Sequence, residues 1–295
     1  MSQSVGIKDS VLFSKLFWKT FQMNLANIGR FMSIPKCAYS IKNIKKSNTN
    51  PKFGLCHSHR NRVIIIIGSF APAITLNCHQ RRQTMKTILF QGDSITNWFR
   101  DRSLGSDLGK GYPNLVAGRL GLDMPGEFQF LNRGVSGDRI VDIYARIKRD
   151  ILNLKPDMLS ILVGINDVWH ELEYSNGVDA KKFKKIYRML LEEIMDTLPD
   201  TKILLMEPFV LKGSATAANI DKFVAETATR AEAVRELALE FHLPFLPLQQ
   251  GLNELVTSMP EDYWLSDGVH PTVYFHQHIA DKWILAFKEM LLTNS

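Results

Sequence analysis

Residues 87–95 read TILFQGDSI, an apolar run of strand length that ends in a glycine, an aspartate and a serine. A serine at the turn between a strand and a helix has its hydroxyl lifted above the edge of the sheet and its backbone N–H near the positive end of the helix. A nucleophilic serine requires this geometry, so Ser94 is a candidate nucleophile. Gly-Asp-Ser is also a common turn sequence, and this segment alone leaves a purely structural role open.

Apolar runs of strand length recur along the chain, and longer helical patterns separate them. The expected strands are residues 87–91, 128–132, 158–163, 203–207 and 244–248, and the expected helices are residues 112–120, 139–154, 180–198, 218–241 and 272–292. Strands that alternate with helices favour right-handed crossovers and a parallel sheet that is covered on both faces. The sequence therefore predicts one α/β/α domain over residues 85–295, with ligands bound beyond the carboxyl ends of the strands.

The first 84 residues differ in charge from the rest of the chain. They hold 13 of the 36 Lys and Arg residues and a single acid, Asp9, which gives +12, whereas residues 85–295 hold 23 bases and 29 acids, which gives −6. All three cysteines also lie in the first part, so the second part has no thiol for a disulfide or a Cys-ligated zinc. The basic character of the whole chain therefore predicts no nucleic-acid partner for residues 85–295.

Two stretches of the first part are similar to targeting segments. Residues 11–32 place apolar side chains near helical spacing among basic ones, as transit peptides do. Residues 63–76 resemble the core of a signal peptide, but this run is too short for a membrane-spanning helix and starts far from residue 1. We interpret residues 1–84 as a basic N-terminal extension, disordered or absent from the mature protein, with a targeting role as the alternative. On this interpretation the protein is cytoplasmic and makes no stable membrane insertion.

Three more loops carry polar residues that the predicted topology brings to the same rim. Residues 132–138 read NRGVSGD after the second strand, residues 164–167 read GIND after the third, and residues 267–271 read DGVHP before the last helix. Together with the segment at Ser94, these blocks resemble the SGNH hydrolases, also called the GDSL esterase and lipase family. The resemblance covers essentially all of residues 85–295. It implies a flavodoxin-like, five-stranded parallel sheet and a serine esterase that forms an acyl-enzyme without a metal or other cofactor.

The resemblance assigns roles to five residues. Ser94 would attack the ester carbonyl, His270 would act as general base and acid, and Asp267 would hold the imidazole in the required tautomer. The oxyanion would receive hydrogen bonds from the N–H groups of Ser94 and Gly134 and from the side-chain amide of Asn166. The presence of all five argues against the alternative of a catalytically silent carbohydrate-binding module.

Neighbouring polar residues have simpler explanations. Ser136 lies in a turn without the complete Gly-x-Ser-x-Gly pattern, so it is the weaker candidate nucleophile. His276 and His278 have no acid three residues before them and are expected to be helix-face residues. Asp167 is expected to cap a helix or turn, and His170 to be an exposed polar residue.

Three of the five tryptophans, Trp98, Trp169 and Trp264, lie beside the motif residues. Aromatic faces stack on sugar rings and also bury acyl chains, although they are equally common as core residues. Residues 132–137 and 162–169 look like the branch of the family that contains acetyl xylan esterases. We therefore expect hydrolysis of O-acetyl groups on a small-molecule or oligosaccharide ester, with lysophospholipase or acyl-thioesterase activity as the alternative. The sequence predicts no particular oligomeric state.

Overall fold

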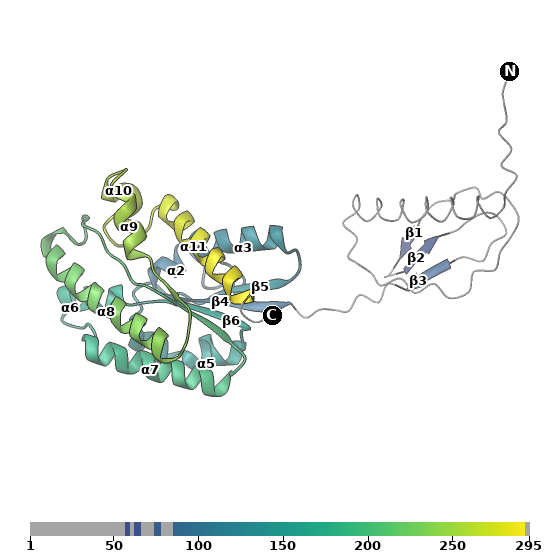
Figure 1. Cartoon of the computed structure of the whole chain (residues 1–295), viewed down its shortest axis with the longest axis horizontal. Coiled ribbons are helices and arrows are strands. Elements are labelled where there is room, and N and C mark those ends of the chain that lie inside the picture. The colour runs from purple at the N-terminus through teal and green to yellow at the C-terminus, as the bar shows by residue number, and fades with distance from the viewer. Residues whose placement is uncertain (1–56, 60–61, 66–73, 78–84, 293–295) are drawn as a thin grey trace, which may run out of the picture. The chain divides into compact units, whose positions relative to one another are not determined.

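The computed structural model describes residues 57–59, 62–65, 74–77 and 85–292, and the chain divides into two compact units, Met1–Gln83 and Thr84–Ser295 (Figure 1). The described part of the first unit is an antiparallel sheet with the order β1-β2-β3. Its strands are β1 (His57–His59), β2 (Arg62–Ile65) and β3 (Ile74–Asn77). Both ends of the apolar run at residues 63–76 thus lie in strands. Residues 11–32 lie outside the described residues, and the extension remains a prediction.

The second unit contains a five-stranded parallel sheet with the order β5-β4-β6-β7-β8. Its strands are β4 (Lys86–Gly92), β5 (Phe128–Asn132), β6 (Met158–Leu162), β7 (Lys202–Met206) and β8 (Phe245–Leu246). Counted along the chain, this is the order 2-1-3-4-5 of flavodoxin-like folds, in which ligands bind where the chain reverses its direction across the sheet. The predicted fold class is confirmed, and the reversal lies between β4 and β6.

Helices cover both faces of this sheet and make three layers (Figure 1). Helices α3 and α11 pack against each other on one face, and α7 and α8 pack against each other on the opposite face. The helices are α2 (Ser94–Asn97), α3 (Tyr112–Asp123), α4 (Ile140–Ala145), α5 (Ile147–Asp150), α6 (Ile165–Tyr174), α7 (Ala180–Thr197), α8 (Ile220–Glu240), α9 (Gln249–Leu255), α10 (Glu261–Trp264) and α11 (Val273–Leu292).

The alternation of side chains along β4 explains why both faces need cover. Ile88 and Phe90 are buried in the core cluster that contains residues of α3 and α11, whereas Leu89 is buried in the cluster that contains residues of α7. Successive strand residues point to opposite faces, so an unbroken apolar strand must be covered on both sides. The burial of both faces therefore places β4 in the middle layer. Its last residue, Gly92, lies at the carboxyl end of the sheet, two residues before Ser94.

Two features differ from the sequence-based expectation. The expected helix at residues 139–154 is interrupted at Arg146, which separates α4 from α5, and a 3-10 turn follows at Leu152–Leu154. The guanidinium of Arg146 forms ion pairs with Asp138, eight residues earlier, and with Asp150, four residues later. In addition, α6, α9 and α10 were not expected as helices.

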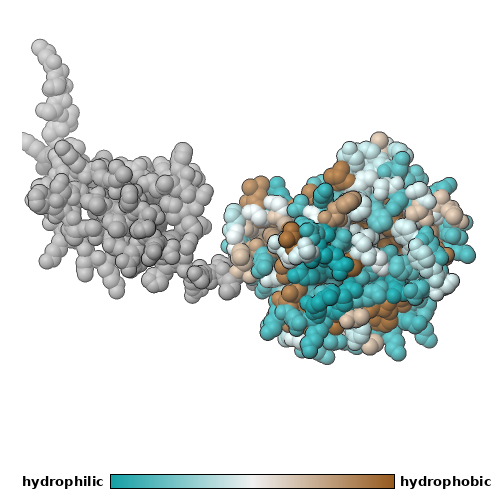
Figure 2. All heavy atoms as spheres, turned by 180° about the vertical axis from the view of Figure 1, so that it is seen from behind, coloured by the Kyte–Doolittle hydropathy of each residue, from teal (hydrophilic) through white to brown (hydrophobic). Residues whose placement is uncertain are grey.

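The surface of the second unit is mixed in polarity. On the face seen in Figure 2, hydrophilic residues form a broad band, and hydrophobic residues lie in smaller patches around it. Among the described helices, none has both the length and the apolar character that crossing a membrane requires.

Candidate active site

Three side chains form one hydrogen-bonded chain at the carboxyl end of the sheet. Ser94 is the first residue of α2, directly after β4, and its Oγ lies 2.9 Å from Nε2 of His270. The other ring nitrogen of His270, Nδ1, lies 2.6 Å from Oδ2 of Asp267. A nucleophile, a base and a group that orients the base need contacts of this length. The structure therefore brings together the three residues for which the sequence predicted these roles.

The loop before α11 holds Asp267 and His270 in a fixed relation. Oδ1 of Asp267 accepts hydrogen bonds from the backbone N–H groups of Val269 (2.9 Å) and His270 (2.8 Å). Leu265 and Pro271 form an isolated antiparallel bridge that closes the loop at its base. Asp267 thus orders the loop with Oδ1 and orients the imidazole with Oδ2. Both contacts require Asp267 and His270 to be close in the sequence, which explains why three residues separate them.

Electrostatics favour a charged Asp267 and a protonatable His270. Burial raises the pKa of Asp267, but hydrogen bonds from the His270 ring and from two backbone N–H groups outweigh burial and bring this pKa down to about 2. Burial lowers the pKa of His270, but the hydrogen bond and negative charge of Asp267 outweigh burial and raise the pKa above its ordinary value. An imidazolium that forms during a reaction is therefore stabilised.

Asp93, the residue before Ser94, lies in a different environment. It is fully buried, its Oδ1 accepts the N–H of Ile95 at 2.9 Å as the N-cap of α2, and its Oδ2 has no partner among the described residues. Burial raises the pKa of Asp93 to about 7. The side chain thus fixes the turn that presents Ser94 and ionises around neutral pH.

The predicted role of Gly134 as an oxyanion donor does not fit the geometry. Its N–H donates to Oδ1 of Asn132 at 2.9 Å, and a backbone N–H has only one hydrogen to give. A Cβ at Gly134 would lie 2.6 Å from the backbone nitrogen of Asn97. The glycine is therefore needed for close packing against α2, and its N–H is already used.

Gly137 is better placed for that role. It has a φ of 84°, and its N–H makes no hydrogen bond within the described residues, as is also true of the N–H of Ser94. Asn166 reaches the same loop, because its Nδ2 donates to the carbonyl of Asp138 at 3.2 Å and keeps a second hydrogen. The sequence holds one signal that could have distinguished Gly134 from Gly137. Asn132 lies two residues before Gly134, and an Asn side chain commonly accepts a hydrogen bond from the N–H two residues ahead.

Asn132 is a buried connector that sequence reasoning missed. Its Nδ2 donates to the carbonyls of Thr96 at 2.6 Å and Leu108 at 2.9 Å, while its Oδ1 accepts from Gly134. One side chain thus joins the turn at Ser94, the segment before α3 and the loop after β5. The rim is held together by these bonds before any substrate binds.

Two of the three predicted tryptophans flank the imidazole. Trp98 stacks on His270 with ring centroids 5.6 Å apart, and Trp169 lies on it at 5.9 Å with tilted planes. Trp264 instead contacts Tyr263 and donates from Nε1 to the carbonyl of Met259 at 3.3 Å. Within the described residues Trp264 has no ring contact with His270, so its predicted place in the substrate site finds no support in these contacts.

The rival polar residues have structural roles. Ser136 accepts a hydrogen bond from Nδ2 of Asn97, and Asp167 accepts the N–H of Ile140 and so caps α4. His276 lies on the buried face of α11, where its Nδ1 accepts the N–H of Tyr112. Burial, followed by the charge of His270, lowers the pKa of His276 to about 3. His276 is therefore a neutral packing residue behind Trp98.

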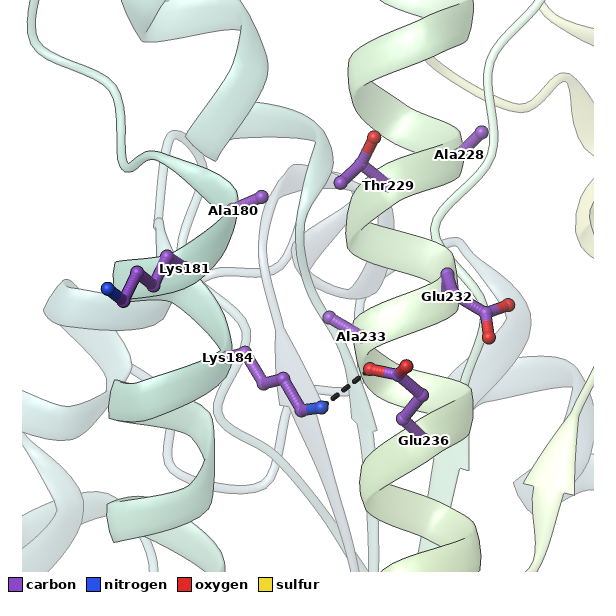
Figure 3. A pocket seen from close by; sticks show the side chains of 8 residues that line it. All are labelled: Ala180, Lys181, Lys184, Ala228, Thr229, Glu232, Ala233 and Glu236. Carbon is purple, nitrogen blue, oxygen red and sulfur yellow. Dashed lines mark hydrogen bonds and ion pairs between the residues drawn. The ribbon is translucent and has the colours of Figure 1, made fainter.

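A separate surface hollow of about 540 Å³ lies between α7 and α8 (Figure 3). The ion pair between Nζ of Lys184 and Oε2 of Glu236, 2.6 Å long, joins the two helices across it. None of its lining residues belongs to the loops that hold Ser94, Asn166 or His270. The hollow is therefore separate from the site described above.

A Ser-His-Asp chain beside free N–H donors, at the reversal point of a flavodoxin-like sheet, is characteristic of hydrolases with a serine nucleophile. Residues 90–278 match the model of the GDSL-like lipase/acylhydrolase family. The chain belongs to this family and is a carboxylic ester hydrolase, as the resemblance predicted.

Proteins similar to this chain match about two thirds of its length. An acetylxylan esterase of Geobacillus stearothermophilus is 32% identical over 200 residues, which are 65% of this chain and 90% of that protein. A putative GDSL-like lipase from Parabacteroides merdae has a solved structure with 34% identity and a TM-score of 0.65, covering 69% of this chain and 97% of that one. A catalytic mutant of Axe2, an acetylxylan esterase from Geobacillus stearothermophilus, has 28% identity and a TM-score of 0.62, covering 69% and 95%.

Proposed function

We propose that the protein hydrolyses O-acetyl esters of carbohydrates, with Ser94 as the nucleophile. The hydrogen-bonded chain from Ser94 to His270 and Asp267 carries the proposal, because it supplies the parts of an acyl-transfer mechanism. The similarity to an acetylxylan esterase over 90% of that protein supports the choice of acetyl groups on a sugar.

The first half of the reaction forms an acetyl-enzyme. His270 removes the proton of Ser94 at Nε2 while Oγ attacks the acetyl carbonyl, and Asp267 stabilises the imidazolium through Nδ1. The N–H groups of Ser94 and Gly137 and the free amide hydrogen of Asn166 stabilise the negative oxygen of the tetrahedral intermediate. The intermediate collapses when the sugar oxygen leaves and takes the proton from Nε2.

The second half releases acetate. Water gives a proton to Nε2 of His270 and attacks the acetyl-enzyme, and the same donors stabilise the second oxyanion. The bond to Oγ of Ser94 then breaks, and the proton returns to the serine. The rings of Trp98 and Trp169 both lie against the His270 ring, and such flat aromatic faces can stack on a sugar ring.

The decisive experiment compares three substrates with the whole chain and its Ser94→Ala variant: p-nitrophenyl acetate, p-nitrophenyl octanoate and an acetylated xylo-oligosaccharide. We expect the acetate and the sugar ester to be hydrolysed faster than the octanoate, and the variant to lose these activities. Faster turnover of the octanoate would favour a lipid or thioester substrate instead. Equal inactivity of both proteins would favour a binding module.

We further propose that the reaction needs no metal ion. Within the described residues, no group of three or more His, Cys, Asp or Glu side chains is arranged to hold one. Treatment with EDTA should leave the rate with p-nitrophenyl acetate unchanged, and zinc-dependent turnover would contradict the serine mechanism.

A further inference from the structure

Basic side chains gather at one side of the active-site rim. Arg100 and Lys110 lie in the segment between α2 and α3 together with Arg102, and Arg133 follows β5. Residues 99–110 and Arg133 carry four basic side chains and two acids, which gives +2, whereas residues 85–295 as a whole carry −6. The rim is thus positive on a domain that is otherwise acidic.

These four basic side chains form no ion pair with a carboxylate of the described residues. Arg100 donates from Nη2 to the carbonyl of Gly134 at 3.1 Å, and Arg133 donates from Nη1 to the carbonyls of Asn132 and Gly105. None of the four cations forms an ion pair with a carboxylate of the described part of the chain. Backbone carbonyls therefore orient the guanidinium groups without neutralising them.

The two acids of this segment are used elsewhere. Asp101 accepts from the N–H and Oγ of Ser103, and Asp107 accepts from the N–H groups of Asp101 and Gly109. Their oxygens order the loop rather than bind the arginines.

The arginines are close enough to act on each other. Burial and the positive charges of Arg133 and Arg102 lower the pKa of Arg100 and outweigh the negative charges of Asp107 and Asp150. In addition, Nε of Arg100 is buried without a hydrogen-bond partner among the described residues. Like charges held together in a partly buried place repel one another, and an anion would relieve that repulsion.

The cluster adjoins the reacting serine. Arg100 contacts Gly134, and Gly134 packs directly against Asn97, the last residue of the helical turn that begins at Ser94. Asn97 lies three residues after Ser94 in α2, a rise of about 4.5 Å along the helix. The arginines are therefore linked to the turn of the reacting serine through Gly134 and Asn97.

We propose that Arg100, Arg102 and Arg133 form a subsite for an anionic group, a carboxylate or a phosphate, on the alcohol part of the ester. The proposal rests on the carbohydrate esterase function proposed above and adds a substrate class to it. A planar guanidinium presents paired N–H donors that match the oxygens of either group. The favoured substrates are acetylated sugars that carry a uronic acid or a phosphate, in preference to their neutral equivalents.

The test uses the whole chain and three substrates: a neutral acetylated xylo-oligosaccharide, the same compound with a glucuronic acid branch, and an acetylated hexose phosphate. Arg102→Gln is the main variant, because the Arg102 side chain is exposed and makes no hydrogen bond within the described residues. Arg133→Gln is the second variant. Arg119→Gln is the control, because it removes one exposed positive charge from α3, where Arg119 pairs with Asp123.

We expect kcat/KM to be about tenfold higher for one charged substrate than for the neutral one, mainly through KM. The preference should shrink severalfold in both variants and in 0.5 M NaCl, and stay unchanged in the control. The arm that shows the preference, glucuronate or phosphate, identifies the anion. Equal rates for charged and neutral sugars, or a preference that survives in both variants, would overturn the subsite.

A second measurement separates this proposal from the esterase function. Free glucuronate and inorganic phosphate are tested as competitive inhibitors of p-nitrophenyl acetate hydrolysis by the wild type and by Arg102→Gln. If none of the three acetylated sugars is hydrolysed, the carbohydrate function fails, yet inhibition that weakens in the variant still supports an anion subsite. Absence of inhibition by both anions, together with no charge preference, contradicts it.

Discussion

Two aspartates beside Ser94 and His270 lie in contrasting environments. Asp93, in the turn after β4, is fully buried and uses one oxygen for a single N–H, and burial raises its pKa to about 7. Asp267, in the loop before α11, is partly exposed and accepts three hydrogen bonds, which outweigh burial and bring its pKa down to about 2.

The comparison shows that the balance between burial and hydrogen bonds decides which carboxylate is charged near neutral pH. Both aspartates favour the protonated imidazole, yet near neutral pH only one of them is fully ionised. Environments that push two acids apart in pKa separate their roles. Asp267 supplies the constant charge and orients the base, whereas Asp93 shapes the turn and adds charge only as the pH rises.

Replacement of each aspartate by asparagine is the strongest test of this division. Asp267→Asn should lower kcat/KM for p-nitrophenyl acetate by about 10³ to 10⁴, because the imidazole loses its charged partner and its tautomer. Asp93→Asn keeps an oxygen for the N–H of Ile95 and should cost less than about tenfold. Losses of equal size in two folded variants would break the comparison.

The second test concerns the stability of Asp93→Asn. Between about pH 4, where an unfolded aspartate ionises, and about pH 7, the folded wild type holds a proton that the unfolded chain has lost, so wild-type stability falls as pH rises through this window. The variant lacks this titration. We therefore compare the free energy of unfolding of the variant minus that of the wild type at two pH values. This difference should be about 1 to 3 kcal/mol larger at pH 8 than at pH 4. Urea denaturation at a series of pH values measures the difference.

Asp267 should show the opposite and smaller pH dependence. Its pKa is depressed in the folded protein, so its contribution to stability is present above about pH 4 and is lost as pH falls toward 2. Because the side chain is partly exposed, solvent screening limits this contribution to about 1 kcal/mol or less. Thermal unfolding of the wild type and Asp267→Asn should therefore converge below pH 3. A gap that widens in acid would contradict the assignment.

The smallest expected effect is on the pH dependence of the rate. The negative charge of Asp93 contributes to the raised pKa of His270. Asp93→Asn should therefore move the acid limb of kcat/KM to lower pH, because the imidazole stays neutral in more acidic solution. An unchanged limb would mean that Asp93 acts only as a helix cap.

Much of this site was predictable, because strand ends and polar blocks are local patterns. The alternation of strands and helices predicted a common rim for the loops that hold Ser94, Asp267 and His270, and the resemblance to the SGNH hydrolases assigned these three residues their roles. Gly134 was assigned a free N–H that Asn132 in fact accepts, and that hydrogen bond depends on the turn after β5.

Other features were not apparent from these patterns. The segment at residues 139–154 contains no Gly or Pro that would mark the break at Arg146. Helix α6 follows β6 after only two residues, Val163 and Gly164, so its apolar spacing merged with that of the strand. The buried position of His276 required knowing which face of α11 meets α3. The position of His276 was thus decided by packing between two helices rather than by the composition of one element.

Ser94 and His270 are separated by 176 residues, and this distance has a consequence during synthesis. At roughly 5 to 20 residues per second, a ribosome needs about 9 to 35 s to travel from the nucleophile to its base. For that time the nascent chain holds the serine without the imidazole that activates it. The chemistry therefore becomes possible only when the last helix has emerged and packed against α3, so the onset of hydrolysis reports that the domain is complete.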